Sequence, residues 1–181
     1  MLKNKKRVVT LLMFVLILLC STTQPASAAV SYKLLPITGY QQEDTNLCWA
    51  ACEQAVLGYL GFSPLPSQYS IVTTVFNPYQ NAPANANQVT NSLTGFGCNA
   101  SASAYSVTFS TIQSYIDNYD SPMITNRSGH ATLIRGYYHN SYPPRQDVYF
   151  IDPSPSADRY QYMAYTMYYP NWYWTVKDIW I

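Results

Sequence analysis

Charged side chains are scarce in this chain of 181 residues, where Asp, Glu, Lys and Arg together make up 10% of the sequence. Soluble domains usually carry about a quarter. Four of the ten basic residues lie within the first seven positions, so residues 29–181 hold six Lys and Arg against nine Asp and Glu, a formal charge of −3. They contain no basic stripe of the kind that binds nucleic acid, and the sequence predicts no nucleic-acid partner.

Long apolar runs are also missing, apart from VVTLLMFVLILLC at positions 8–20. That run is shorter than the roughly 20 residues that a membrane-spanning helix needs. It follows a basic segment and precedes Ala26-Ser27-Ala28, which is the order found in secretory signal peptides. We therefore expect residues 1–28 to be a cleaved signal and residues 29–181 to be secreted, without stable membrane association after cleavage. An uncleaved N-terminal anchor is the alternative.

Histidine and cysteine are few. The chain has two histidines, His130 and His139, and three cysteines after the predicted signal, Cys48, Cys52 and Cys98. An odd number of cysteines in an exported protein leaves at least one thiol free or intermolecular. Zinc would need ligands such as Cys48, Cys52 and His130, but the chain lacks the Cys-x-x-Cys or paired-histidine spacing of such sites.

The sequence is instead rich in tyrosine, with 18 residues, and in neutral polar side chains. This composition is typical of an extracellular protein with many strands and loops. Residues 29–181 are enough for one domain with a single core.

The hydrophobic pattern places helices first and strands second. Apolar residues at helical spacing predict a helix from Leu47 to Leu60, with Asp44, Thr45 and Asn46 as candidate N-caps. Weaker helix patterns occur at 66–76, at 84–97 and after Ser110. Strands are expected at 32–40, 103–109, 122–126, 130–139 and 147–152, followed by aromatic alternation through 160–181. This order is typical of an α+β fold with a mainly antiparallel sheet.

Cys48 lies where the first predicted helix begins. A helix N-terminus and a nearby imidazolium both lower the pKa of a thiol below its usual value of about 8.5, as a cysteine nucleophile requires. His130 begins an apolar strand after a turn at Gly129, whereas His139 is expected in a solvated loop. Asp152 ends the next strand, and an antiparallel hairpin would bring the His130 and Asp152 ends side by side.

Four segments in this order carry a family resemblance: Gln42, Cys48-Trp49-Ala50-Ala51, Gly129-His130-Ala131 with Gly136-Tyr137, and Ile151-Asp152-Pro153. Together they resemble the papain-like cysteine peptidases. The resemblance is closest to compact bacterial members similar to the bacteriocin-leader peptidases and to plant-pathogen effector proteases. It spans about residues 34–181, and its most specific element is the glutamine six positions before a Cys-Trp pair.

The resemblance implies a papain-like fold and hydrolysis of a protein or peptide substrate through a thioester acyl-enzyme. It implies Cys48 as the nucleophile, His130 as general base and acid, and Asp152 as the group that orients His130. The Gln42 side chain and the Cys48 backbone N–H would form the oxyanion hole, with Gln41 as the alternative to Gln42. No cofactor or metal is implied.

Two questions stay open at this point. Cys52 could be a core thiol or could pair with Cys98, whereas a bond from Cys52 to Cys48 is disfavoured because neighbours on one helix face rarely meet disulfide geometry. The function could also be that of an extracellular binding or toxin-like module on the same fold, or acyl transfer or deamidation by the same residues. The sequence carries no signal for an oligomeric state.

Overall fold

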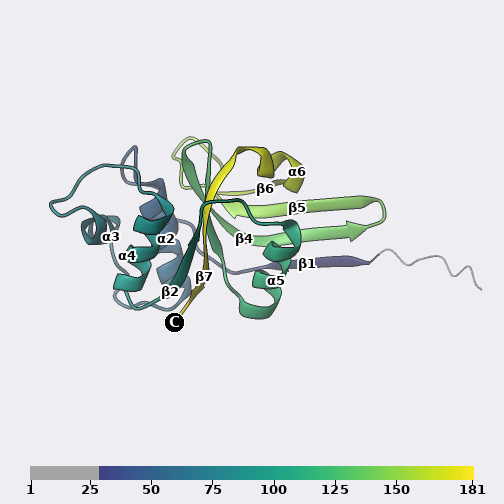
Figure 1. Cartoon of the computed structure of the whole chain (residues 1–181), viewed down its shortest axis with the longest axis horizontal. Coiled ribbons are helices and arrows are strands. Elements are labelled where there is room, and N and C mark those ends of the chain that lie inside the picture. Colours follow the sequence, from purple (N-terminus) through teal and green to yellow (C-terminus); the bar gives the residue numbers. More distant parts are fainter. Residues whose placement is uncertain (1–28) are drawn as a thin grey trace, which may run out of the picture.

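Three helices, α2, α3 and α4, gather at one end of an antiparallel sheet, and a long hairpin extends from the other end (Figure 1). The computed structural model describes residues 29–181, so the predicted signal at residues 1–28 lies outside it. The helices are α2 (Cys48–Tyr59), α3 (Gln68–Val75), α4 (Ala86–Gly95), α5 (Phe109–Tyr119), the short α6 (Tyr165–Tyr168) and the 3₁₀ turn η1 (Tyr169–Asn171). The strands are β1 (Val30–Leu34), β2 (Asn99–Ser103), β3 (Met123–Arg127), β4 (His130–Ser141), β5 (Pro144–Ile151), β6 (Tyr160–Ala164) and β7 (Trp172–Trp180).

The central helix, α2, is buried on nearly every side. Nine of its twelve residues are buried, including Cys48, Trp49 and Cys52, and three alanines let neighbouring elements approach closely. A helix that is apolar all round is stable only inside a core. α2 accordingly lies between the other helices and β4, which fixes its first residue, Cys48, against the sheet.

The N-terminus of α2 differs from the prediction. The helix begins at Cys48, its cap position is Leu47, and no side chain caps it. The predicted caps are engaged elsewhere, because Asp44 Oδ1 accepts the Thr45 N–H at 2.7 Å and Asn46 Nδ2 donates to the carbonyl of Asn81 at 3.1 Å. The first N–H groups of α2, which have no intrahelical acceptors, are therefore left without a side-chain cap.

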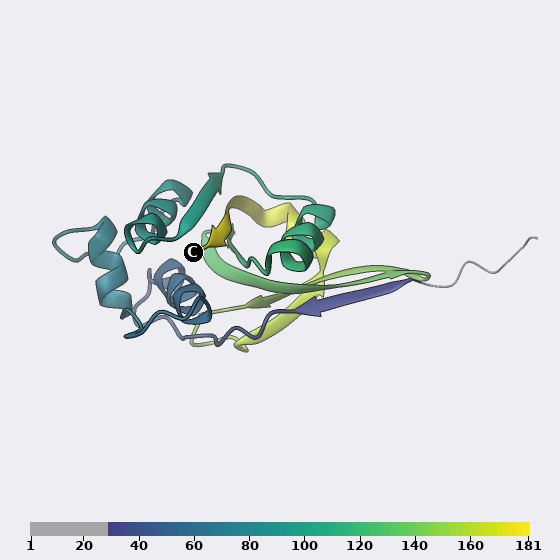
Figure 2. The same ribbon diagram turned by 90° about the horizontal axis from the view of Figure 1, so that it is seen from below.

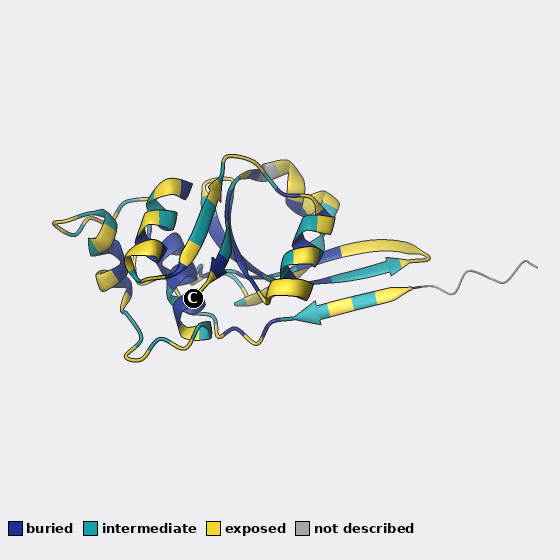
Figure 3. Ribbon diagram, turned by 60° about the horizontal axis from the view of Figure 1, so that its bottom comes forward, coloured by how far each residue is buried: buried dark blue, intermediate teal, exposed yellow. Residues whose placement is uncertain are grey.

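β4 organises the sheet, whose strand order is β2-β7-β3-β4-β5-β6. One edge of β4 pairs with β3 through residues 130–134 and with β1 through residues 136–140, and its other edge pairs with β5. Figure 2 shows β1 running beside the β4–β5 hairpin. Both strands of the hairpin are buried near the helices and become exposed toward its tip (Figure 3).

The structure confirms the predicted α+β class and the helices at 66–76 and 84–97, but three segments differ. The strand expected at 32–40 ends at Leu34, where β1 ends. The segment 103–109, expected as a strand, is mostly a connection, since β2 ends at Ser103 and α5 begins at Phe109 with Thr108 rather than Ser110 as its cap. Residues 165–171, expected to continue a strand, form α6 and η1. Tyrosines and small residues fit either conformation, so packing against the sheet decides these segments.

Candidate active site

Cys48 is the first residue of α2 and is 7% exposed. The backbone N–H of Ala131, the second residue of β4, donates to Cys48 Sγ at 3.3 Å. A thiol that accepts N–H bonds at a helix N-terminus is stabilised in its ionised form. The Ala131 contact involves the main chain only, so no side-chain signal in the sequence could have revealed it.

His130 is the first residue of β4 and follows a tight turn. Gly129 has a φ of 83°, which favours glycine, and its N–H donates to Asn126 Oδ1 at 3.1 Å. The His130 ring is 34% exposed, and its Nε2 lies 2.7 Å from Asp152 Oδ1. This leaves Nδ1 as the ring nitrogen that can exchange a proton with Cys48.

Asp152 follows β5, as the hairpin argument predicts. β4 and β5 pair with Leu133 opposite Ile151, which places the start of β4 beside the end of β5. The carboxylate is 14% exposed and also accepts the Ser154 N–H at 2.9 Å. Asp152 is therefore held by the backbone that follows it as well as by His130.

The charges of the three groups support one another. Burial alone would raise the pKa of the Cys48 thiol, but the hydrogen bond with His130, the Ala131 N–H and the imidazolium charge outweigh burial, so the net pKa lies below its usual value. The hydrogen bond to Asp152 comes first among the causes that raise the pKa of His130 from 6.5 to about 9. Burial raises the pKa of Asp152, and the His130 and Ser154 hydrogen bonds lower it by more. The site thus favours a thiolate, an imidazolium and a carboxylate.

Gln42 lies in the loop before α2, but its amide is occupied in this structure. Its Nε2 donates to the carbonyls of Asp44 at 2.8 Å and Thr45 at 3.0 Å. An oxyanion could receive one of these N–H groups only if the corresponding carbonyl released it. The neighbouring Gln41 is exposed, and its Oε1 lies 3.5 Å from Arg159 Nη2. The oxyanion roles of the two glutamines remain predictions.

The three cysteines within residues 29–181 are all free thiols, so the possible Cys52–Cys98 bond is not formed. Successive residues on a helix point about 100° apart, so Cys48 and Cys52, four residues apart on α2, lie on nearly the same face. Cys52 lies near Cys48 and Asp152, whereas Cys98 lies near the carboxyl of Glu53. Burial, first among the causes, raises the pKa of both Cys52 and Cys98, which distinguishes them from Cys48.

The second histidine, His139, lies within β4. The expectation of a loop position for His139 is therefore wrong. It is nine residues from His130 along the strand, a separation of roughly 30 Å at about 3.3 Å per residue. Its ring packs against Phe109, with centroids 5.9 Å apart. His130 is therefore the histidine that can serve Cys48.

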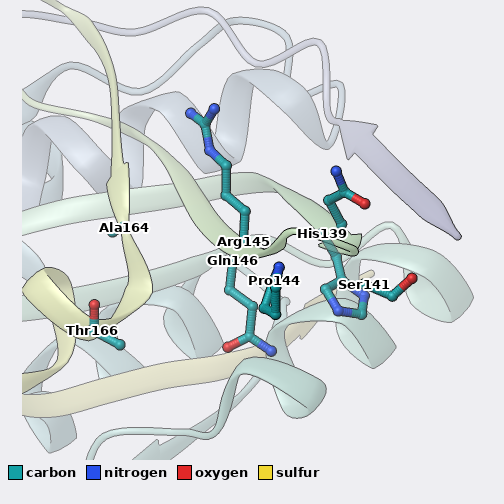
Figure 4. Close-up of a pocket in the computed structure, with 8 residues that line it drawn as sticks. His139, Ser141, Pro144, Arg145, Gln146, Ala164 and Thr166 are labelled. Atoms are coloured by element: carbon teal, nitrogen blue, oxygen red, sulfur yellow. The ribbon is translucent and has the colours of Figure 1, made fainter. Parts of the chain in front are cut away.

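His139 borders a hollow of about 520 Å³ at the tip of the hairpin, together with Arg145 and Gln146 of β5. Figure 4 shows the Arg145 and Gln146 side chains leaving β5 in opposite directions. Arg145 pairs with Asp147 at 2.6 Å. This hollow belongs to the end of the sheet that lies away from Cys48.

Within residues 29–181, no group of three or more His, Cys, Asp or Glu side chains is placed to hold a metal ion. No helix in the same range is both long and apolar enough to cross a membrane.

Comparison with known structures supports the fold. UfSP from C. elegans superposes with a TM-score of 0.61 at 10% identity, over 89% of this chain and 36% of that one, so this chain spans about a third of its length. The peptidase domain of Streptococcus ComA, described as a bifunctional ABC transporter involved in quorum sensing, gives 0.57 at 14% identity over 77% and 96%. A double-glycine-motif protease from an AMS/PCAT transporter, solved with its leader peptide, gives 0.55 at 14% identity over 79% and 91%.

Comparison of the sequence with protein-family models gives the family. A search of curated proteins found no match. The model of the Peptidase_C39 like family, however, matches residues 34–178, a range that contains Cys48, His130 and Asp152. A papain-like fold with this match identifies a cysteine-type peptidase, and the chain belongs to the Peptidase_C39 like family.

Proposed function

We propose that this chain is a secreted cysteine protease that hydrolyses peptide bonds with Cys48, His130 and Asp152. The observation that carries the proposal is the geometry of His130, which bonds Asp152 through Nε2 and keeps its other ring nitrogen for a buried thiol of lowered pKa. An activated thiol, a histidine and a group that orients the histidine form the arrangement used for nucleophilic catalysis. Secretion rests on the sequence pattern of residues 1–28.

The reaction has two stages. The Cys48 thiolate attacks the carbonyl carbon of the scissile bond, and the negative charge passes to the carbonyl oxygen beside the uncapped N-terminus of α2. The tetrahedral intermediate expels the amine, which takes a proton from His130, and a thioester to Cys48 remains. His130 then removes a proton from water, which attacks the thioester and releases the carboxylic acid and the thiolate.

We propose a peptide segment as the substrate. A similar structure holds a leader peptide, and the acyl-enzyme route above requires an acyl group with an amine leaving group. The sequence of the cleaved segment is to be found by offering a peptide library to the full-length protein.

The test is alkylation of the cysteines by iodoacetamide across pH, read by peptide mass spectrometry. Cys48 is expected to react at a lower pH than Cys52 and Cys98, which serve as internal controls because burial raises the pKa of both. In His130→Ala, reaction of Cys48 should begin near the ordinary thiol value of about 8.5. Cys48→Ala should abolish peptide hydrolysis, whereas Cys52→Ala should retain it.

The proposal fails if Cys48 reacts as an ordinary thiol with no dependence on His130. A binding module on the same fold would then be the better account, and Cys48→Ala would leave its binding intact. If Cys48 is activated but transfers acyl groups to amines rather than to water, the same residues carry an acyl transferase.

A further inference from the structure

Arg159 links three segments around the active site. It lies between β5 and β6, just before Tyr160, and its side chain is partly buried. Its Nη1 donates to the carbonyl of Asp152 and to the carbonyl of Tyr40, both at 3.0 Å. Its own carbonyl accepts the Asp152 N–H at 3.0 Å. One guanidinium thus joins the residue that orients His130 to the loop before α2.

The loop before α2 lies directly on this region. The Gln42 N–H donates to the carbonyl of Pro153 at 2.9 Å, and the Gly39 N–H donates to the Tyr160 hydroxyl at 3.0 Å. A Cβ on Gly39 would lie 2.8 Å from Arg159 Cδ, closer than real side chains pack. The loop that carries Gln41 and Gln42 is therefore seated against Arg159 with no space between them.

We propose that Arg159 is a positioning residue of the Cys48–His130–Asp152 site, one that fixes the Asp152 backbone and the loop bearing Gln42 in a single arrangement. This inference rests on the proposed function, because it concerns the same site. Arg159 does not touch the reacting atoms. It acts through Asp152 on one side and through Tyr40 on the other.

The contacts explain why an arginine is suited to this place. The planar guanidinium presents several N–H groups in fixed directions, so it can bridge two carbonyls at once. A lysine offers one flexible ammonium group and keeps the charge but not the bridge. Lysine substitution therefore separates the effect of the charge from the effect of the bridge.

The two effects also have opposite signs at His130. Removing a positive charge near an imidazolium favours its protonated form and would raise the pKa of His130. Releasing Asp152 would weaken the hydrogen bond that comes first among the causes of the raised His130 pKa, and would lower that pKa from about 9. The alkaline limit of activity is the pH above which His130 loses its proton and the thiolate–imidazolium pair is lost. This limit moves up if Arg159 acts through its charge and down if it acts by positioning Asp152.

The experiment measures peptide hydrolysis and Cys48 alkylation across pH in the full-length protein and in R159Q, R159K and R145Q. Arg145 is the matched control, since it is also an arginine bonded to an aspartate, in its case the Asp147 carboxylate, which lies within β5 away from the Asp152 end. We expect kcat/KM to fall about ten- to a hundredfold in both Arg159 variants, the scale of loss for a misplaced catalytic group. The alkaline limit should move down by about one pH unit toward the ordinary histidine value of about 6.5. R145Q should show neither change.

Each remaining outcome overturns the inference. An alkaline limit that rises, or full rescue by R159K, would show that only the charge matters. A lowered melting temperature in R159Q with an unchanged pH profile of hydrolysis would show that Arg159 only stabilises the fold. Comparison with the melting temperature of R145Q shows whether that loss is specific to Arg159. If Cys48 of the unaltered protein reacts as an ordinary thiol, the proposed function fails first and the role of Arg159 fails with it. An activated Cys48 that is indifferent to Arg159 overturns the role of Arg159 alone.

Discussion

At the scale of single residues, the environment of Cys48 decides between two opposed effects. Burial of a thiol favours its neutral form, and burial comes first among the causes that raise the pKa of Cys52, one helical turn away, ahead of the nearby charges of Cys48 and Asp152. Cys48 differs because His130 and the Ala131 N–H contact its sulfur. Specific partners, together with the place of Cys48 at the first residue of the helix, therefore make one of the two thiols suitable for chemistry.

Gln42 provides a prediction at this scale. Gln42→Ala should lower kcat by about a hundredfold or more, as loss of one oxyanion donor does elsewhere, because one Gln42 N–H is expected to leave a loop carbonyl for the developing oxyanion. Gln41→Ala should have a much smaller effect, since its exposed side chain has a single contact at 3.5 Å. Single-turnover hydrolysis of a peptide measures both.

Alkylation of Cys48 supplies the control for this pair. It needs a thiolate but no oxyanion, so Gln42→Ala should alkylate at the rate of the unaltered protein. Equal losses of kcat in the two variants would contradict the assignment of Gln42. Slower alkylation in Gln42→Ala would mean that the glutamine shapes the loop through Asp44 and Thr45 and does not act on the reaction.

At the scale of elements, β4 connects the site to the rest of the sheet. His130 begins it, and Gly136 pairs with Leu34 of the antiparallel strand β1. A Cβ on Gly136 would lie 2.5 Å from the carbonyl oxygen of Lys33, a backbone atom that cannot move without displacing β1. The pairing of β1 thus depends on the absence of a side chain at Gly136.

Gly136→Ala should lower the free energy of unfolding by about 1–3 kcal/mol, the usual cost of inserting a methyl group into a packed site. Urea unfolding measures the change. Gly95→Ala is the control, because the last residue of α4 has no atom within 4 Å of a new Cβ and alanine favours a helix by about 0.5–1 kcal/mol over glycine. Equal stability of the two variants would show that β1 pairs loosely.

How far the sequence predicts the molecule also depends on the element. The helix at α2 and the β4–β5 hairpin could be predicted, because strong apolar patterns specify them and the hairpin aligns His130 with Asp152. The missing cap of α2 could not be predicted, since Asn46 bonds the distant Asn81 instead of the helix. The contacts of Arg159 could not be predicted either, because its acceptors are main-chain carbonyls, which every residue carries whatever its side chain.

At the scale of the whole molecule, the proposed active site lies where the helical end meets the sheet, with the thiol on α2 and the imidazole on β4. The helical end is held together by a buried polar chain as well as by apolar packing. Thr74 Oγ1 of α3 donates to Ser92 Oγ of α4 at 2.7 Å, and Ser92 donates to Glu53 Oε1 of α2 at 2.6 Å. Glu53 is fully buried, and its Oε2 has no hydrogen-bond partner among residues 29–181.

The buried Glu53 at the end of these hydrogen bonds predicts how the stability of the molecule changes with pH. Burial raises the pKa of Glu53 well above its usual range, against a smaller lowering by the Ser92 hydrogen bond, so the folded protein holds a proton that the unfolded chain releases. The contribution of Glu53 is fully present below the unfolded value of about 4.3 and is lost as the pH rises toward the raised folded pKa. Glu53→Gln keeps the acceptor for Ser92 and removes the titration. Its free energy of unfolding, relative to the unaltered protein, should therefore increase steadily as the pH rises above the unfolded value of about 4.3.

Subtracting one protein from the other isolates Glu53, because His130, Cys48 and the remaining groups titrate in both. Urea unfolding at several pH values gives the difference directly. A Glu53→Gln difference that is constant with pH would mean that Glu53 is ionised in the folded protein. The unpartnered Oε2 would then need a buried cationic or N–H partner, and the packing of α2 against α4, which sets the position of Cys48, would have to differ from the arrangement described above.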